Sequence, residues 1–276
     1  MTVLQAILLG LIQGLSEFIP ISSTAHLTLA GHLLGVIEGT APEAWTSFMA
    51  TIQLGTLLAV FVYFARDVRD IPLAFIKENF TSKRKKISEQ SLSSRMGWLI
   101  CVGSIPIATI GLALKKVIEG DFTKSPTVIG CSLIALALIM AFAERVGKFS
   151  RDGEKLGFKD AIFIGLAQCL ALIPGASRSG TTITAGMFMG LTREAAARFS
   201  FLLSIPAILA SGLLEFFQSL SYIDASQLVN LIVATVISAI SGYISIAFLL
   251  KFLKTRTTYS FAIYRIIIGI AVLLYL

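Results

Sequence analysis

The sequence predicts an all-α polytopic membrane protein, and three observations support this fold class. Apolar residues fill 55% of the 276 positions and charged residues only 14%, whereas a soluble domain typically carries about 25% charged residues. Several apolar stretches approach the roughly 20 residues that a helix needs to cross a bilayer. Two further apolar regions are interrupted by proline and a polar cluster. We therefore expect six transmembrane helices plus two re-entrant helix hairpins, arranged as an inverted-topology repeat.

Six segments are long and apolar enough to span, and charged residues stand near several of their ends. The predicted spans cover residues 44–65, 97–116, 125–143, 195–217, 227–250 and 260–276. Charged pairs mark their limits at Arg66-Asp67, Lys115-Lys116 and Glu144-Arg145. Together with the two interrupted regions these spans fill the chain, so we expect residues 1–276 to form a single membrane domain.

The interrupted regions, residues 2–36 and 161–191, are expected to differ from ordinary spans. One breaks at Pro20 and the hydroxyl cluster after it, and the other at Pro174 and the segment up to Gly180. Backbone groups freed by such a break cannot face lipid, because no water is there to bond them. We interpret each region as a re-entrant hairpin in which a helix enters, turns and leaves on the same side. A kinked continuous span is the alternative.

The two interrupted regions resemble each other. The segment Gly10–Leu15 lies 155 residues before Gly165–Leu170, and the same offset places Ser22 on Ser177 and Gly31 on Gly186. The sequence therefore predicts an internal duplication. The predicted repeats are residues 1–150 (hairpin 2–36 plus three spans) and residues 155–276 (hairpin 161–191 plus three spans).

The distribution of basic residues predicts the orientation. The loops at 66–95, 144–160, 192–198 and 251–259 hold eighteen Lys and Arg residues, and the opposite side holds Lys115, Lys116 and Lys124. Lys and Arg are enriched in cytoplasmic loops. The four loops are therefore expected in the cytoplasm, with both termini outside. Three spans per repeat would invert the second repeat, so that the two polar turns meet near the midplane.

The net charge of +7 is explained by these loops, so we expect no nucleic acid partner. The most hydrophilic run, residues 77–90, is predicted to be a solvated loop, with attraction to anionic lipid headgroups as a further interpretation. Cys101, Cys131 and Cys169 lack paired spacing, so neither a disulfide framework nor a zinc site is expected. Met1–Leu9 lacks the basic region of a signal peptide and is expected to remain in the mature protein.

The first hairpin contains the candidate acid and the candidate proton-transfer group. Gln13 and Glu17 stand four residues apart and share a helix face, where Glu17 suits a metal ligand or proton-transfer role, with Gln13 as a second ligand. Ser23 suits a hydroxyl nucleophile or a phosphate donor, and His26 suits an imidazole acid/base, with a water molecule as the alternative attacking group. Ser22 and Thr24 are candidates for phosphate binding. A structural ion pair for Glu17, with Arg178 or Arg265, is the plainer interpretation.

The second hairpin contains the candidate anion site. Its turn opens a helix at Ser177-Arg178-Ser179-Gly180-Thr181-Thr182, and helix N-termini bind anions through free N–H groups. Gly180 allows backbone to approach a ligand, and the guanidinium of Arg178 matches phosphate oxygens. The residues from Ser177 to Thr182 therefore predict phosphate binding, and hydrolysis of a diphosphate would use the acid, the imidazole and the guanidinium together.

These motifs resemble a known family. Residues 13–27 (QGLSEFIPISSTAHL) and 174–182 (PGASRSGTT) are similar to the two signatures of the bacterial undecaprenyl-diphosphatases, also called bacitracin-resistance proteins. The similarity extends over essentially the whole chain, including 52–55, 168–172 and 261–265. The family's acidic residue falls on Glu17, its histidine on His26 and its arginine on Arg178. Position 13 is Gln where some members have Glu, which weakens the case for a two-carboxylate metal site.

The resemblance implies a multi-pass enzyme of the bacterial plasma membrane that converts undecaprenyl diphosphate to undecaprenyl phosphate and inorganic phosphate. This reaction recycles the lipid carrier of cell-wall synthesis and confers bacitracin resistance. The resemblance also implies a divalent cation, Mg²⁺ or Ca²⁺, and a site that opens to the periplasmic side. Exposed apolar spans suggest a homodimer. The alternative function is a transporter or flippase for a phosphate-bearing lipid or anion, because inverted repeats with broken helices are also a transporter architecture.

Overall fold

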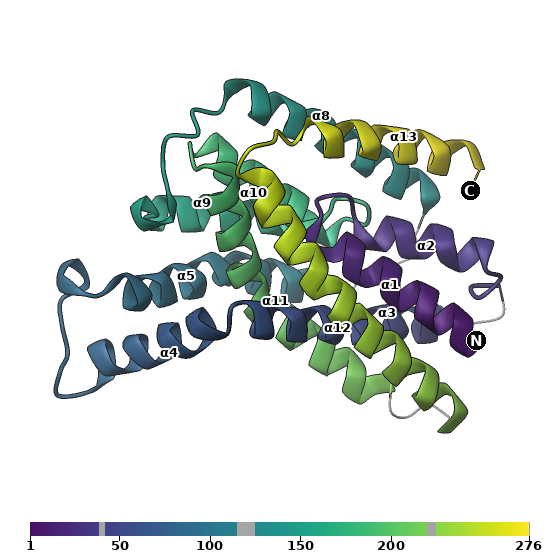
Figure 1. Ribbon diagram of the computed structural model, residues 1–276, viewed down its shortest axis with the longest axis horizontal. Helices are drawn as coiled ribbons and strands as arrows, with labels where there is room; N and C mark the ends of the chain where they lie inside the picture. Colours follow the sequence, from purple (N-terminus) through teal and green to yellow (C-terminus); the bar gives the residue numbers. More distant parts are fainter. Residues whose placement is uncertain (39–41, 115–124, 220–224, 276) are drawn as a thin grey trace.

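The computed structural model describes residues 1–38, 42–114, 125–219 and 225–275, and these residues are helical apart from turns, loops and one isolated bridge. The helices pack side by side (Figure 1). Their bounds are α1 Val3–Phe18, α2 Ser23–Leu33, α3 Pro42–Tyr63, α4 Ala65–Phe80, α5 Leu92–Ala113, α8 Pro126–Val146, α9 Phe158–Gln168, α10 Arg178–Phe188, α11 Arg193–Ser219, α12 Ala225–Leu253 and α13 Tyr259–Tyr275. Short 3₁₀ helices η1, η2 and η3 cover Ile87–Glu89, Gly153–Lys155 and Cys169–Leu172.

Within the described ranges, five helices are long and apolar enough to cross a membrane: α3, α5, α8, α11 and α12. Each coincides with a predicted span, although α5 begins at Leu92 rather than residue 97. The sixth predicted span forms α13, an apolar helix of 17 residues. The multi-pass membrane class is therefore confirmed. Lys115, Lys116 and Lys124, which marked the outer side, lie outside the described residues.

Both interrupted regions reverse direction at the predicted places. Helix α1 ends at Phe18 and α2 begins at Ser23, and the side chain of Gln5 near the start of α1 donates to the carbonyl of Leu34 after α2, at 2.9 Å. Helix α9 is followed by η3 and α10 begins at Arg178. There, Arg151 bridges Asp160 at the start of α9 and the carbonyl of Met189 after α10. Each region is thus a helix hairpin, closed at its base by polar contacts.

The prediction that residues 66–95 form a loop is wrong for much of this range. Ala65–Phe80 forms helix α4, which packs along α5 (Figure 1). The helix forms because apolar residues recur at helical spacing between its charges, so that one face packs inward. Phe75 of α4 fills the space beside Gly97 and contacts the ring of Trp98 at 5.0 Å. Pro72 lies within α4 without ending it.

The two hairpins are held against long helices by close backbone contact. Helix α1 packs along α12, and α9 packs against α5. A β-carbon on Gly14 of α1 would lie 2.6 Å from the backbone nitrogen of Gly242. A β-carbon on Gly165 of α9 would lie 2.9 Å from the Cα of Gly103. Because only glycine permits these approaches, the positions of both hairpin turns are fixed by the helices around them.

Candidate active site

A serine in a left-handed conformation starts the second helix of each hairpin. Ser22 has φ 76° and Ser177 has φ 67°, a region that costs non-glycine residues on the order of 1–3 kcal/mol. The hydroxyl of Ser22 accepts from the backbone N–H of Ala25 at 3.4 Å, and that of Ser177 accepts from Gly180 at 3.2 Å. Both serines therefore cap a helix whose N-terminus opens into the turn, and such strain is typical of functional sites.

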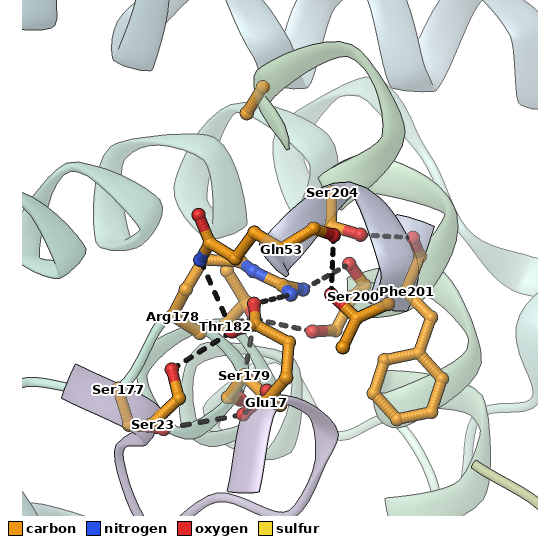
Figure 2. A network of polar contacts seen from close by, with 12 residues as sticks. Glu17, Ser23, Gln53, Ser177, Arg178, Ser179, Thr182, Ser200, Phe201 and Ser204 are labelled. Atoms are coloured by element: carbon orange, nitrogen blue, oxygen red, sulfur yellow. Dashed lines mark hydrogen bonds and ion pairs between the residues drawn. The ribbon is translucent and has the colours of Figure 1, made fainter. Parts of the chain in front are cut away.

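Glu17, at the end of α1, is the centre of a polar cluster between the two turns (Figure 2). It is 5% exposed, and its Oε2 accepts from Gln13 at 2.9 Å, from the Ser23 hydroxyl at 2.9 Å and from Gln53 at 3.2 Å. Its Oε1 accepts from the Nη2 of Arg178 at 2.8 Å. A buried carboxylate is stable only when paired and hydrogen-bonded, and here donors from both hairpins and from α3 meet that requirement.

Arg178 connects the two hairpins through this ion pair and is otherwise held by the helices behind it. Its Nη1 donates to the carbonyl of Ser200 in α11 at 3.4 Å. Thr182 fixes the start of α10, because its hydroxyl bonds the Arg178 carbonyl at 2.7 Å and the Ser200 hydroxyl at 2.6 Å. Ser179 donates to the Glu17 carbonyl at 3.2 Å. The backbone of one turn is thus bonded to the side chains of the other.

The structure does not pair Ser23 with His26, although their spacing suggested a shared cavity. The Nδ1 of His26 lies 2.7 Å from the Ser22 carbonyl, and its Nε2 lies 2.8 Å from the Tyr264 hydroxyl. Because a carbonyl only accepts, Nδ1 carries a proton, and in the neutral ring Nε2 accepts from the Tyr264 hydroxyl. The two rings are also stacked, with centroids 5.5 Å apart. Ser23 instead donates to Glu17.

The remaining sequence-derived candidates lie at the same turns. Thr24 is half-buried at the start of α2, and the Thr181 hydroxyl donates to the Arg178 carbonyl at 3.0 Å. Gly180 lies against Arg265, whose Nη1 would be 2.5 Å from a β-carbon at that position. All of the phosphate-binding candidates in the second hairpin are therefore gathered around the N-terminus of α10.

Arg265 of α13 also lies at the candidate site. The sequence suggested it only as an ion-pair partner for Glu17. It is fully buried, and it donates to the carbonyls of Ala176 at 2.9 Å, Gly175 at 3.3 Å and Pro20 at 3.5 Å. Its carbonyl acceptors thus come from both turns, and its Nε has no partner within the described part of the chain. Arg265 therefore ties the two turns together rather than neutralising Glu17.

Gln53 and Tyr264 were also missed as site residues. Gln53 reaches Glu17 from the middle of α3, a long apolar helix, and Tyr264 reaches His26 from α13. A polar residue inside an apolar span was the available signal for Gln53, and adjacency to an intramembrane arginine was the signal for Tyr264. Neither signal identifies the partner, because that depends on how distant helices pack.

The donor set can be compared with what a divalent cation requires. Among the residues that the structure describes, no group of three or more His, Cys, Asp or Glu side chains is gathered. Around Glu17, the amides of Gln13 and Gln53 turn their Nε2 groups toward the carboxylate, so the oxygen ligands gathered there are those of Glu17 and of the Ser23 hydroxyl. Mg²⁺ and Ca²⁺ prefer oxygen, and Mg²⁺ often takes one or two carboxylates with substrate phosphates. These residues fit an ion of this kind if the protein supplies one carboxylate ligand, that of Glu17, and the substrate phosphates supply others.

Known proteins resemble this chain over nearly its whole length. Residues 6–271 match the family described as bacitracin resistance protein BacA. The chain belongs to this family. It is 56% identical to an undecaprenyl-diphosphatase of Syntrophobacter fumaroxidans, over 99% of this chain and 97% of the relative. It is 51% identical to an undecaprenyl-diphosphatase of Chloroherpeton thalassium, over 99% and 96%, and 45% identical to one of Myxococcus xanthus, over 100% and 90%.

Proposed function

We propose that this BacA-family chain hydrolyses undecaprenyl diphosphate to undecaprenyl phosphate and inorganic phosphate. The reaction recycles the lipid carrier for cell-wall synthesis and confers resistance to bacitracin. The observation that supports it best is the buried pair of Glu17 and Arg178, formed between two helix N-termini that open into facing turns. A guanidinium, free helix N–H groups and an acid in one place are what transfer of a phosphoryl group requires.

The proposed reaction uses the contacts of Ser23, Glu17 and Arg178. Ser23 already donates to the carboxylate of Glu17, which is the arrangement of a nucleophile and its base. Its oxygen would bond the terminal phosphorus as the bridging P–O bond breaks and undecaprenyl phosphate leaves, while Glu17 takes the hydroxyl proton. Water would then release phosphate from Ser23. Arg178 and the N-terminus of α10 would stabilise the charge on the transferring group.

The other candidates receive supporting roles. Ser22, Thr24, Ser177, Ser179, Gly180, Thr181 and Thr182 would shape and bind the phosphates at the two turns. His26 would transfer a proton at its Nε2 once the Tyr264 hydroxyl moves off that atom. A divalent cation, Mg²⁺ or Ca²⁺, would be held by Glu17 with Gln13, and would supply charge neutralisation of the diphosphate.

The finer architecture is part of the same proposal. Matching turns 155 residues apart support an inverted duplication with repeats at 1–150 and 155–276, because Gly35 and Gly190 both have positive φ and close equivalent turns after α2 and α10. The excess of basic residues in the loops supports a plasma-membrane orientation with those loops in the cytoplasm, both termini outside and the site open to the periplasm. A homodimer through exposed apolar helices also remains a proposal.

The function is tested with purified full-length protein in detergent, undecaprenyl diphosphate and a phosphate-release assay, with Mg²⁺ or Ca²⁺ and with a chelator. We expect release that needs the cation and is abolished by Arg178→Ala. A protein that releases no phosphate but moves a phosphate-bearing lipid across liposome membranes would instead be a transporter or flippase. Arg178→Ala with normal turnover would show that the site lies elsewhere.

A further inference from the structure

A second polar site lies far along the chain from the hairpin turns, where the loop after α4 meets the start of α5. It is an open cavity of about 650 Å³. Its lining includes three consecutive basic residues, Arg84, Lys85 and Lys86, together with Asn79 and Trp98. In Figure 1 this loop lies at the outer end of the α4–α5 pair, away from α10 and α2. None of these residues belongs to the proposed phosphatase site.

The cavity has a fixed polar floor. The Oδ1 of Asn79 accepts from the indole N–H of Trp98 at 3.1 Å and from the amide of Gln90 at 2.8 Å. Its Nδ2 donates to the carbonyl of Phe75 at 2.8 Å. Asn79 thus links α4, α5 and the end of the loop. Because these bonds hold the loop at both sides, the basic side chains are presented over a preformed surface.

Two of the three basic residues lack a neutralising partner. The ammonium of Lys85 lies 3.6 Å from Glu78. The backbone N–H of Ser91 bonds Glu78 and keeps the pKa of its carboxyl below the usual value, so that this ion pair persists at neutral pH. For Arg84 and Lys86, no carboxylate of the described chain lies within ion-pair distance. The cavity therefore has an unbalanced positive charge.

The surroundings place this charge at the boundary of the bilayer. Trp98 lies just inside the apolar part of α5, after Arg95, and tryptophan is enriched at membrane–water interfaces. On α4, Leu73, Ile76 and Phe80 share one face and are 60%, 54% and 72% exposed. An amphipathic helix with such a stripe and basic neighbours is typical of one lying in the headgroup region. These features fit a cavity that faces lipid headgroups rather than bulk water.

From the unpaired positive charge of the cavity and its position beside Trp98 and the apolar face of α4, we propose that this cavity binds the phosphate headgroup of an anionic phospholipid. Arg84 and Lys86 supply the charge, and Asn79 and Trp98 form the floor. A zwitterionic lipid fits poorly, because it would bring its own cation against two unpaired basic side chains. The site would anchor the α4–α5 pair to a negatively charged leaflet, independently of the reaction at Glu17.

The test uses the full-length protein with Trp45→Phe, which leaves Trp98 as the remaining tryptophan of two. Trp98 fluorescence is followed in detergent micelles during titration with phosphatidylglycerol, phosphatidylcholine or inorganic phosphate. We expect saturable change with phosphatidylglycerol alone. Arg84→Gln/Lys86→Gln should weaken its binding about tenfold or more, with phosphatase activity unchanged. Lys155→Gln/Lys159→Gln, which removes the same charge at two exposed positions elsewhere on the protein, should bind normally.

Three results would overturn the proposal. Equal binding of phosphatidylcholine would show that charge does not select the ligand. Displacement of phosphatidylglycerol by millimolar phosphate, with the same fluorescence change, would show a free-anion site. Equal weakening by both double variants would show diffuse attraction to the whole basic surface instead of a defined cavity.

Discussion

The two hairpins share one framework but differ in the side chains placed on it. Ser22 and Ser177 have the same left-handed conformation and cap helices in the same way. Counting 155 residues on from Glu17 leads to Leu172, and counting on from Ser23 leads to Arg178. The first hairpin therefore provides the acid and the second provides the guanidinium. Neither hairpin has both groups, so the candidate site is complete only where the two turns meet.

The contrast extends to a buried amide on each entering helix. Gln13 bonds Glu17, whereas Gln168, at the matched position, is fully buried and neither of its side-chain polar atoms has a partner in the described structure. Helix α1 continues through Glu17, but α9 gives way to the 3₁₀ helix η3 at the equivalent place. The two hairpins can differ in this way because the close glycine contacts and the serine-capped turns keep the backbone of each hairpin in place.

The largest effect is expected from removing either charge. Arg178→Ala and Glu17→Ala should each lower kcat for phosphate release by about 10³-fold, the scale for losing one preorganised electrostatic group. Arg145→Ala and Glu154→Ala, at exposed positions, are the matched controls and should keep normal turnover. If either site variant kept its activity and a normal circular dichroism spectrum, the two hairpins would not act together in one active site.

Removing the link between the turns should have the next largest effect. Arg265→Met deletes the donor to Pro20, Gly175 and Ala176 and leaves buried carbonyls unpaired. We expect kcat to fall by about 10²-fold and hydrogen exchange to rise at residues 19–22 and 174–177. Unchanged exchange at these turns would show that Arg265 does not hold them together, and Arg265→Lys should restore part of the activity.

Gln53 tests whether α3 contributes to the position of the acid. Gln53→Ala removes one of the four side-chain donors to Glu17, and we expect about a tenfold loss in kcat with little change in KM. Gln53→Glu should be worse than Gln53→Ala, because it places a second carboxylate beside Glu17. The opposite order would indicate that position 53 faces a cation rather than Glu17.

The smallest effects distinguish the paired amide from the unpaired one. Gln13→Leu should lower activity about tenfold, since Glu17 loses a donor. Gln168→Leu should leave kcat unchanged and keep or raise the melting temperature, because it removes a buried amide whose side chain makes no hydrogen bond to any residue that the structure describes. Thermal unfolding and phosphate release on the two variants measure the difference. Loss of activity in Gln168→Leu would reveal a role for the second amide.

The sequence predicted the helical membrane class and the positions of the two turns, because each has a local cause. Long apolar runs and their charged ends specify spans, and Pro20 and Pro174 with their polar neighbours specify the turns. Helix α4 was missed because its charges made it look like a loop, although its apolar face packs on α5. Two members of the candidate site, Glu17 and Arg178, were predictable because each places a charge in an apolar stretch of sequence.

The contacts within the site were not predictable, because they depend on packing between distant segments. The spacing of Ser23 and His26 suggested a pair, but the start of α2 turns Ser23 toward Glu17 and His26 toward Tyr264. Gln53 and Arg265 enter from α3 and α13, far away in the chain. The sequence identifies polar residues whose burial in an apolar chain costs free energy, but it does not show which of these residues contact one another.

A double-mutant cycle between Glu17 and Arg178, measured as phosphate released from undecaprenyl diphosphate, tests most directly whether the two hairpins form one active site. If they do, Glu17→Ala/Arg178→Ala will lose little more activity than either single variant, because residues acting as a unit are strongly non-additive. If the losses multiply to about 10⁶-fold, the two residues act independently, and the account of a shared site is contradicted.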